Sequence, residues 1–408
     1  MLYIHQTISI KRCLASLLLF AGCFYFSSAG AFNLVRPENT IASHPGLTET
    51  YWEGHLSVSG GAAAKDALHA DRLGLHRYQS KGHKPVAALL YLPGTHMNGV
   101  MSDLDAAHNL PAWLADRGVV LFTLDYRNHF LGNDDLADQS VLKNWTIERY
   151  VDDAMLALGQ VRQLNPDLPV FVAGFSRGAS IAWGVACQDS DLSGIIALDG
   201  SFKQYREKPY DREAAVNKLR NSGEYAYILS RTRGWPGRQA LMRSVRQNPN
   251  GPALDGSNDT VGHQLSRTLH NAWGAGVLTN VLGGVSDITA LATLMENYDR
   301  YYPAVQNIDN ASIASVADDP STPVDNGWGE IRMPVLYMGA SRMGAEHLLD
   351  GIYSAGKSGS GDVTIYVLED YGHLDVLVAE NAQQDVYTPL LRWLLGRLPV
   401  RDPGVRPG

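Results

Sequence analysis

Short, continuous apolar runs recur along the chain, and turn residues bound each of them. A strand that is covered on both faces of a parallel sheet has this continuous apolar character, whereas a half-exposed strand alternates. Such buried strands are predicted at residues 86–92, 119–124, 169–173 and 194–198. Further strands are predicted at residues 334–338 and 363–368, and edge strands near residues 51–52 and 55–58.

Amphipathic segments separate these runs. Residues 144–164 place apolar side chains at the helical spacing i, i+3, i+4 and i+7, and Pro166 then ends the segment. Shorter helices are predicted within residues 106–117, 179–187 and 380–397. The alternation of strand and helix predicts an α/β fold, in which helices cover both faces of a mostly parallel central sheet.

The alternation of strand and helix stops between residues 201 and 331, where helical segments occur without a clear buried strand. We interpret residues 201–331 as a largely helical cap or lid insertion over the carboxyl ends of the strands. Residues 32–200 and 332–408 would then form the core. The alternative is that residues 201–331 continue the core through elements that the pattern does not reveal. As a cap, the segment would set specificity, and its Trp and Tyr content indicates an apolar pocket.

The segment Gly174-Phe175-Ser176-Arg177-Gly178 directly follows a predicted buried strand and directly precedes an apolar helix. A Gly-x-Ser-x-Gly turn in this context is typical of a nucleophile elbow, which exposes the serine hydroxyl above the sheet. The N-terminus of the following helix favours negative charge that develops nearby. Ser176 is therefore the predicted nucleophile, and the alternative is a structural turn that merely contains serine.

A second signal, Gly372-His373, follows the last predicted strand. A serine hydroxyl is a weak nucleophile until a base accepts its proton, and an imidazole is suited to this near neutral pH. His373 is therefore the predicted general base. Taken alone, a histidine in such a loop is more simply a surface residue.

Together, Leu92-Pro93-Gly94-Thr95, the turn at Ser176 and Gly372-His373 resemble the α/β-hydrolase superfamily. The resemblance covers most of residues 85–200 and 330–397. It implies an esterase, lipase or related acyl hydrolase with a cap over its pocket. It also implies an oxyanion hole that uses the backbone N–H of Arg177 and that of Thr95 or His96, although His96 fits pocket lining better.

The acid that completes a catalytic triad must lie between the serine and the histidine in the chain. In the superfamily it commonly follows the strand that is predicted here at residues 334–338, but residues 339–344 contain no acid. Asp199, at the end of the strand at 194–198, fits the other position known in the superfamily. We favour Asp199, and Glu346 is the alternative.

Two further acids are less suitable. Asp350 comes later than Glu346, on a predicted helix. Asp375 follows His373 too closely to be its partner, and we expect it to cap the next helix.

Residues 1–31 have the three-part layout of a secretory signal peptide. Lys11 and Arg12 precede an apolar run at residues 14–26, and Ala29-Gly30-Ala31 offers a cleavage site. The protein is therefore expected to be secreted or periplasmic, without a membrane span after cleavage. The alternatives are an uncleaved membrane anchor and lipidation at Cys23. Cleavage would leave Cys187 without a partner for a disulfide.

The composition narrows the range of partners. A formal net charge of −8 argues against a nucleic-acid partner, which usually requires a basic face. The sequence contains no His-Glu-x-x-His motif and no phosphate-binding loop, so neither a metal nor another cofactor is expected. The expected partner is a small-molecule or lipid ester.

The predicted reaction is hydrolysis of carboxylic esters through an acyl-enzyme on Ser176. Amide or peptide cleavage and acyl transfer would use the same residues. A non-catalytic binding protein on a hydrolase fold is the alternative from a different class.

Overall fold

The computed structural model describes residues 32–399, apart from residues 56–70, 102, 135, 137, 207, 230–233, 274–284 and 316–321. The predicted signal peptide, with Cys13 and the lipidation candidate Cys23, lies outside the described residues. No helix in the described ranges combines the length and the apolar character that are needed to cross a bilayer.

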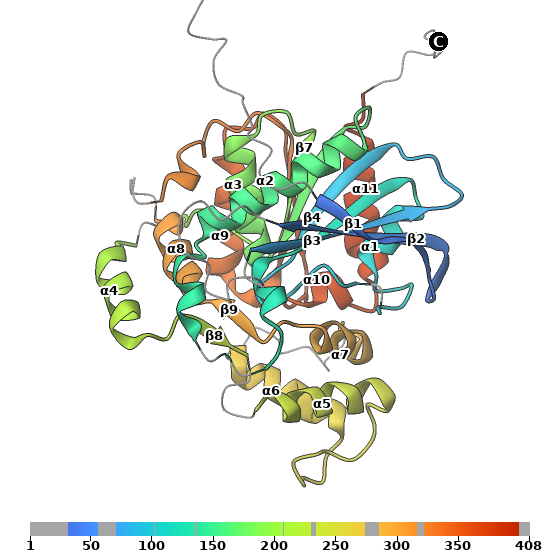
Figure 1. Ribbon diagram of the computed structural model, residues 1–408, viewed down its shortest axis with the longest axis vertical. Coiled ribbons are helices and arrows are strands. Elements are labelled where there is room, and N and C mark those ends of the chain that lie inside the picture. The colour runs from blue at the N-terminus through green and yellow to red at the C-terminus, as the bar shows by residue number, and fades with distance from the viewer. Residues whose placement is uncertain are drawn as a thin grey trace, which may run out of the picture.

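A nine-stranded sheet forms the centre of the protein (Figure 1), in the order β1-β2-β3-β5-β4-β6-β7-β10-β11. Six neighbouring strands of this sheet run parallel to one another, namely β5, β4, β6, β7, β10 and β11. Strands β1, β2 and β3 extend the sheet beyond β5 as an antiparallel edge. The prediction of a mostly parallel sheet is confirmed. The strand bounds are β1 Phe32–Ile41, β2 His44–His55, β3 Arg72–Ser80, β4 Ala87–Leu92, β5 Val119–Asp125, β6 Val170–Phe175, β7 Gly194–Leu198, β10 Val335–Ala340 and β11 Val363–Leu368.

The strands at the two edges of the sheet differ in length and burial from those predicted from the sequence. The antiparallel strands β1 and β2 are longer than the short edge strands predicted near residues 51–58, of which residues 56–58 lie outside the described ranges. Strand β11 is the last strand of the sheet, and its apolar side chains from Ile365 to Val367 are partly exposed. A local apolar run predicts a strand but not its place in the order, because that place depends on pairing with distant segments.

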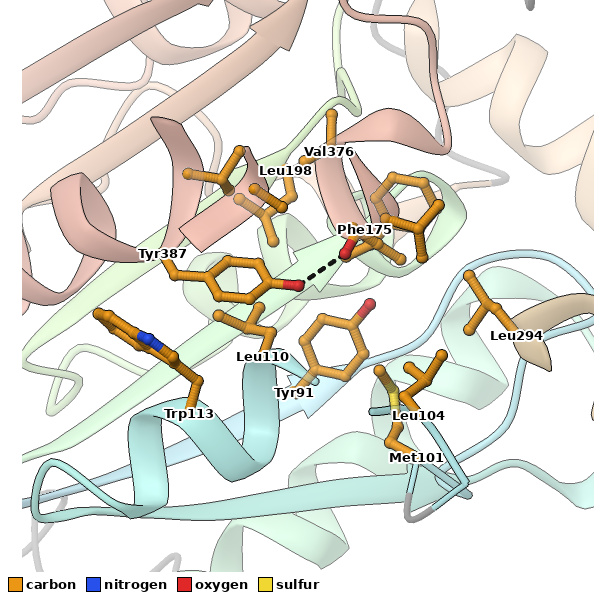
Figure 2. Close-up of a cluster of buried hydrophobic side chains, with 14 of the residues drawn as sticks. Tyr91, Met101, Leu104, Leu110, Trp113, Phe175, Leu198, Leu294, Val376 and Tyr387 are labelled. Carbon is orange, nitrogen blue, oxygen red and sulfur yellow. Dashed lines mark hydrogen bonds between the residues drawn. The ribbon is translucent and has the colours of Figure 1, made fainter. Parts of the chain in front are cut away.

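Helices cover both faces of the sheet, as predicted, and two apolar clusters lie between them and the strands. Figure 2 shows the cluster under α1 and α11, in which Tyr91, Trp113 and Tyr387 pack together. The second cluster lies under α2 and α3. The bounds are α1 Leu110–Ala115, α2 Ile147–Leu164, α3 Arg177–Gln188, α9 Ala345–Gly356, α10 Asp375–Val378 and α11 Thr388–Leu395.

In the described part of residues 201–331, no segment joins the nine-stranded sheet. Two three-residue strands, β8 and β9, instead pair as a small antiparallel sheet, and α5, α6 and α7 lie away from the large sheet (Figure 1). The sequence does not reveal β8 and β9 because three residues carry no periodicity. The bounds are α4 Arg212–Ser222, β8 Ala226–Ile228, α5 Trp235–Gln247, α6 Val261–Trp273, α7 Ile288–Glu296, β9 Tyr301–Pro303 and α8 Val305–Ala314.

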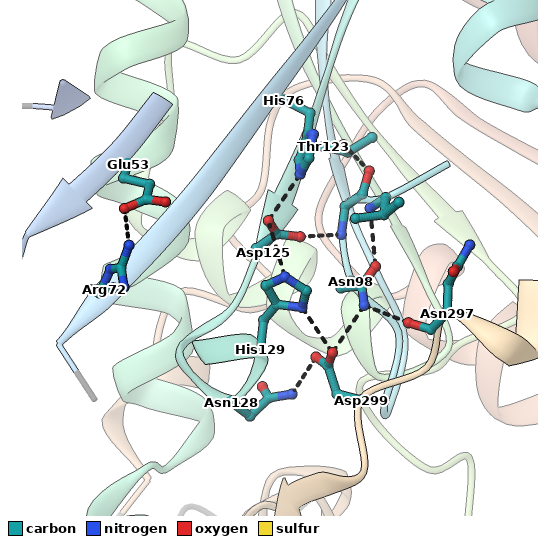
Figure 3. Close-up of polar contacts among 12 residues, drawn as sticks. Glu53, Arg72, His76, Asn98, Thr123, Asp125, Asn128, His129, Asn297 and Asp299 are labelled. Carbon is teal, nitrogen blue, oxygen red and sulfur yellow. Dashed lines mark hydrogen bonds and ion pairs between the residues drawn. The ribbon is translucent and has the colours of Figure 1, made fainter. Parts of the chain in front are cut away.

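A chain of histidines and carboxylates, all buried except the partly exposed His129, links the antiparallel edge to the segment 201–331 (Figure 3). His76 on β3 donates its Nδ1–H to Glu49, at 2.7 Å, and its Nε2–H to Asp125, at 2.9 Å. His129 donates its Nδ1–H to Asp299, just before β9, at 2.9 Å, and its Nε2 lies 3.9 Å from Asp125. We call these five residues the histidine–carboxylate chain.

The same chain fixes the loop that follows β4. The backbone N–H of Asp299 donates to the carbonyl of His96, at 2.7 Å, and the Asn98 amide donates to the Asp299 carboxylate, at 3.0 Å. The N–H of Gly99 donates to the Asp125 carboxylate, at 2.7 Å. Both Asp125 and Asp299 therefore hold the loop that connects β4 to α1.

Both histidines of the chain are held in the charged form. Burial alone lowers the pKa of His129, but the carboxylates of Asp125 and Asp299 outweigh it and raise that pKa to about 10. In the same way Asp125 and Glu49 raise the pKa of His76 to about 9 against the effect of burial. A histidine in the unfolded chain has a pKa of about 6.5. The folded protein therefore binds extra protons from about pH 6.5 to pH 10.

This difference predicts that the free energy of unfolding falls as the pH rises from 7 to 10, because the folded state loses protons that the unfolded state has already lost. In a His129→Gln variant the fall should be smaller, by on the order of 2 kcal/mol. Urea unfolding of the parent and of the variant at a series of pH values measures this change in the free energy of unfolding. A His263→Gln variant is the control, since His263 on α6 is 60% exposed and should follow the parent. Equal pH dependence in the parent and in His129→Gln would contradict the prediction.

Candidate active site

Ser176 lies at the sharp turn between β6 and α3, as the Gly-x-Ser-x-Gly motif predicts. Its backbone has φ 56° and ψ −120°, a conformation that is strained for a residue with a side chain. The two glycines permit the turn. A Cβ on Gly178 would lie 2.0 Å from the carbonyl oxygen of Leu92, and one on Gly174 would lie 2.1 Å from that of Gly178. Strand, turn and helix therefore present the Ser176 hydroxyl at the carboxyl edge of the sheet.

The imidazole of His373 meets this hydroxyl from the loop after β11. The Ser176 Oγ–H donates to His373 Nε2, at 2.7 Å. The ring of Phe175 stacks on the imidazole, with 4.7 Å between the ring centroids. The His373 Nδ1–H donates to the carboxylate of Asp199, at 2.5 Å. Three residues that are far apart in the sequence therefore form one continuous line of hydrogen bonds.

Asp199 lies directly after β7 and is fully buried. Its second carboxylate oxygen accepts the N–H of Ala340, at 2.8 Å, and the Nε2–H of His347, at 3.2 Å. Burial alone raises the pKa of Asp199, but the hydrogen bonds from His347 and His373 outweigh it and hold that pKa well below its usual range. The carboxylate is therefore charged at neutral pH.

The other acids considered from the sequence lie elsewhere. Glu346 is exposed on the first turn of α9 and pairs with Lys208, at 3.1 Å. Asp350 accepts the N–H of Tyr205, at 3.0 Å. The expected helix cap at Asp375 is wrong, because its carboxylate accepts the N–H of Gly372, at 2.7 Å, and so fixes the loop that carries the histidine.

His347, which contacts Asp199, is a neighbour of the site that sequence reasoning missed. Burial lowers its pKa, but the hydrogen bond and the charge of Asp199 outweigh burial and raise it. The available signal was its place shortly after β10, at the same sheet edge as Ser176. An alternating or motif-like pattern is absent there, so nothing local separates His347 from an ordinary surface histidine.

The two oxyanion-hole candidates on the loop after β4 differ in position. Thr95 lines a pocket together with Ser176 and Arg177. His96 is buried, with its ring packed against Tyr227 and Tyr302, and its Nδ1–H donates to the carbonyl of Asp299, at 2.9 Å. Burial lowers the pKa of His96 to about 3, so the ring is neutral. His96 therefore has a packing role here, and the pocket lining expected of it is wrong.

The pocket beside Ser176 has a volume of about 410 Å³. Most of its lining residues are polar, and Ser201, Tyr227, Asn307 and Asn310 come from the segment 201–331. The pocket surface is therefore mixed in polarity, and the expected apolar character is present only in part. Of the aromatic side chains of that segment, Tyr227 lines the pocket, whereas Trp235, Tyr301 and Tyr302 are buried in the packing of the segment.

Asp199, His347 and His373 offer ligand atoms that all lie within 4.8 Å of one another, a spacing at which a metal ion can be held. The same atoms are already joined by hydrogen bonds of 2.5 and 3.2 Å. A metal ion at this position would have to replace the bond between His373 and Asp199.

The comparison with protein families identifies the family of the chain. A model of an alpha/beta hydrolase family matches residues 89–387, which include every strand from β5 to β11 and the residues described above. The chain belongs to the alpha/beta hydrolase family. No curated protein sequence is significantly similar to it.

Solved structures resemble this alpha/beta hydrolase in fold. A provisionally assigned lipase from Sulfolobus solfataricus has a TM-score of 0.69 at 20% sequence identity, and the match covers 90% of this chain and 99% of that one. The peroxisomal alpha-beta-hydrolase Lpx1 from Saccharomyces cerevisiae has a TM-score of 0.50 at 12% identity, over 88% of this chain and 92% of its own. At these identities the likeness concerns the fold alone.

Proposed function

We propose that this alpha/beta hydrolase cleaves carboxylic esters through an acyl-enzyme on Ser176. The observation that carries the proposal is the line of hydrogen bonds from Ser176 through His373 to Asp199, at 2.7 and 2.5 Å, at the edge of a pocket. A serine beside a base that is itself oriented by a third group is the arrangement that activates a hydroxyl for acyl transfer.

In the first step His373 Nε2 accepts the proton of the Ser176 hydroxyl while Oγ attacks the ester carbonyl carbon. The resulting tetrahedral intermediate collapses, its bond to the alcohol oxygen breaks, and the imidazolium gives its proton to that oxygen. In the second step His373 accepts a proton from water, whose oxygen attacks the acyl-enzyme. The acid leaves and the proton returns to Ser176.

Asp199 orients the base and stabilises its charged form. Its hydrogen bond to Nδ1 keeps Nε2 of the neutral ring free to accept the serine proton. Because the pKa of Asp199 is held low, the carboxylate stays charged while His373 gains and loses its proton. The bonds from Ala340 and His347 hold this carboxylate in place.

The negative charge of the tetrahedral intermediate requires hydrogen-bond donors that are already in position. We assign this role to the backbone N–H of Arg177, the first residue of α3, and to that of Thr95, which lines the same pocket. The N-terminus of α3 adds a favourable dipole next to the nucleophile. The bonds that fix the loop after β4 to Asp125 and Asp299 would keep the second donor in place.

Secretion and a lid function for residues 201–331 remain proposals. The first rests on the layout of residues 1–31. The second rests on the pocket-lining residues that this segment supplies. Amide cleavage and acyl transfer would use the same line of hydrogen bonds, so a panel of matched esters, anilides and acceptor alcohols separates them.

Replacement of Ser176 by alanine should lower kcat/KM for 4-nitrophenyl esters of graded acyl length by at least about 10⁴-fold, because the nucleophile is lost. Circular dichroism and the unfolding midpoint should match the parent. Ser222→Ala, at the exposed end of α4, is the control and should keep full activity. Parental activity in Ser176→Ala would exclude this mechanism.

The two acids that the sequence left open are separated by a matched pair of variants. Asp199→Asn should lower kcat/KM by on the order of 10³- to 10⁴-fold, because the amide favours the wrong tautomer of His373. Glu346→Gln should change kcat/KM by less than about twofold, since Glu346 pairs with Lys208 at the surface. Steady-state kinetics on one ester decides the question, and the reverse order of effects would assign the acid to Glu346.

A further inference from the structure

The pocket wall next to Ser176 contains an arginine, Arg177, that forms no ion pair within the part of the chain that the structure describes. The Arg177 guanidinium donates to the carbonyl of Gln306, at 3.0 Å, and to Oδ1 of Asn307, at 2.9 Å. Both acceptors are neutral. A guanidinium has five N–H donors, so further donors remain. Within the described residues, no carboxylate lies at ion-pair distance from Arg177.

The nearby acids already have other partners. Asp309 pairs with Arg212, at 2.8 Å, and accepts the N–H of Ile147, at 3.0 Å. Asp199, the acid that lines the pocket, bonds to His373, His347 and Ala340. The positive charge of Arg177 is therefore exposed to the pocket in a protein whose formal net charge is −8.

Two asparagines of the same wall add donors rather than acceptors. Oδ1 of Asn307 accepts from Arg177, and Oδ1 of Asn310 accepts from the Ser180 hydroxyl, at 3.1 Å. Their Nδ2 groups make no hydrogen bond to another described residue. Arg177, Asn307 and Asn310, which we call the donor wall, therefore offer a cation and N–H groups to whatever enters the pocket.

We propose that the donor wall binds a carboxylate of the substrate, so that the preferred substrates are esters that also carry a carboxylate. This inference rests on the proposed ester hydrolysis at Ser176. A planar guanidinium binds a carboxylate through two parallel hydrogen bonds, and the asparagine amides can donate to its remaining lone pairs. A neutral ester would leave these donors without partners, which is costly in a partly buried site.

The test uses two pairs of esters that differ in one charge. The first pair, 4-nitrophenyl hydrogen adipate and methyl 4-nitrophenyl adipate, varies the acyl side. The second pair, 4-butyryloxybenzoate and its methyl ester, varies the alcohol side. The ratio of kcat/KM, charged over neutral, is measured for the parent and for Arg177→Met, which keeps the backbone N–H of residue 177. Dividing the two ratios removes the intrinsic reactivity of each ester.

In the parent, the charged ester of one pair should be preferred, and Arg177→Met should lower the ratio by roughly 10- to 100-fold. The pair that responds identifies the side of the ester that carries the carboxylate. Arg177→Lys, which keeps the charge but loses the planar fork, should give an intermediate ratio. Arg220→Met, which removes an exposed arginine on α4, is the control and should keep the parental ratio.

Three results would contradict these expectations in distinguishable ways. Turnover of the neutral esters with no preference for the charged ester in either pair would overturn the inference and leave ester hydrolysis intact. A preference that survives in Arg177→Met would overturn the assignment to the donor wall. If the parent turned over none of the four esters, the proposed function itself would fail, and the inference with it.

Discussion

The common carboxyl edge of three neighbouring strands, β6, β7 and β10, is the constraint on which the site depends. Ser176 follows β6, Asp199 follows β7, and the N–H of Ala340 at the end of β10 holds the Asp199 carboxylate. Backbone bonds from Ser176 to Leu198, at 2.9 Å, and from Asp199 to Met338, at 2.7 Å, extend the pairing past the strands. This pairing fixes where Ser176 and Asp199 lie along the edge of the sheet. The Ser176 hydroxyl and the Asp199 carboxylate therefore reach the two different ring nitrogens of His373.

The segment 201–331 is tied to this edge by polar contacts as well as by packing. Asp299 fixes the loop that carries Thr95, and Arg177 bonds to Gln306 and Asn307 at the start of α8. The same segment supplies part of the pocket wall. In the proposed mechanism, substrate specificity and the position of the oxyanion donors would be coupled, because the segment that lines the pocket also holds the loop that carries Thr95.

Local sequence signals predict much of the fold and part of the site. The buried strands, the helix at 147–164 and the turn at Ser176 each depend on contacts within a short stretch of chain, so pattern alone reveals them. Asp199 was favoured because it ends a predicted strand and so fits a position that the resemblance to the superfamily allows for the acid. His347 and the donor wall were not found, since their neighbours are distant in sequence. The polar side chains of the pocket lining were not predicted, because composition does not tell which side chains of the segment face the pocket.

The central claim, that His373 activates Ser176, is tested most directly by labelling with a fluorophosphonate, which reacts with an activated serine and not with an ordinary hydroxyl. Intact-mass measurement and peptide mapping of the labelled protein should find one adduct, on Ser176, formed rapidly in the parent and at least about 10³-fold more slowly in His373→Ala. Absence of an adduct on Ser176, or equal labelling rates with and without the imidazole, would contradict the account and favour a non-catalytic binding role on the same fold.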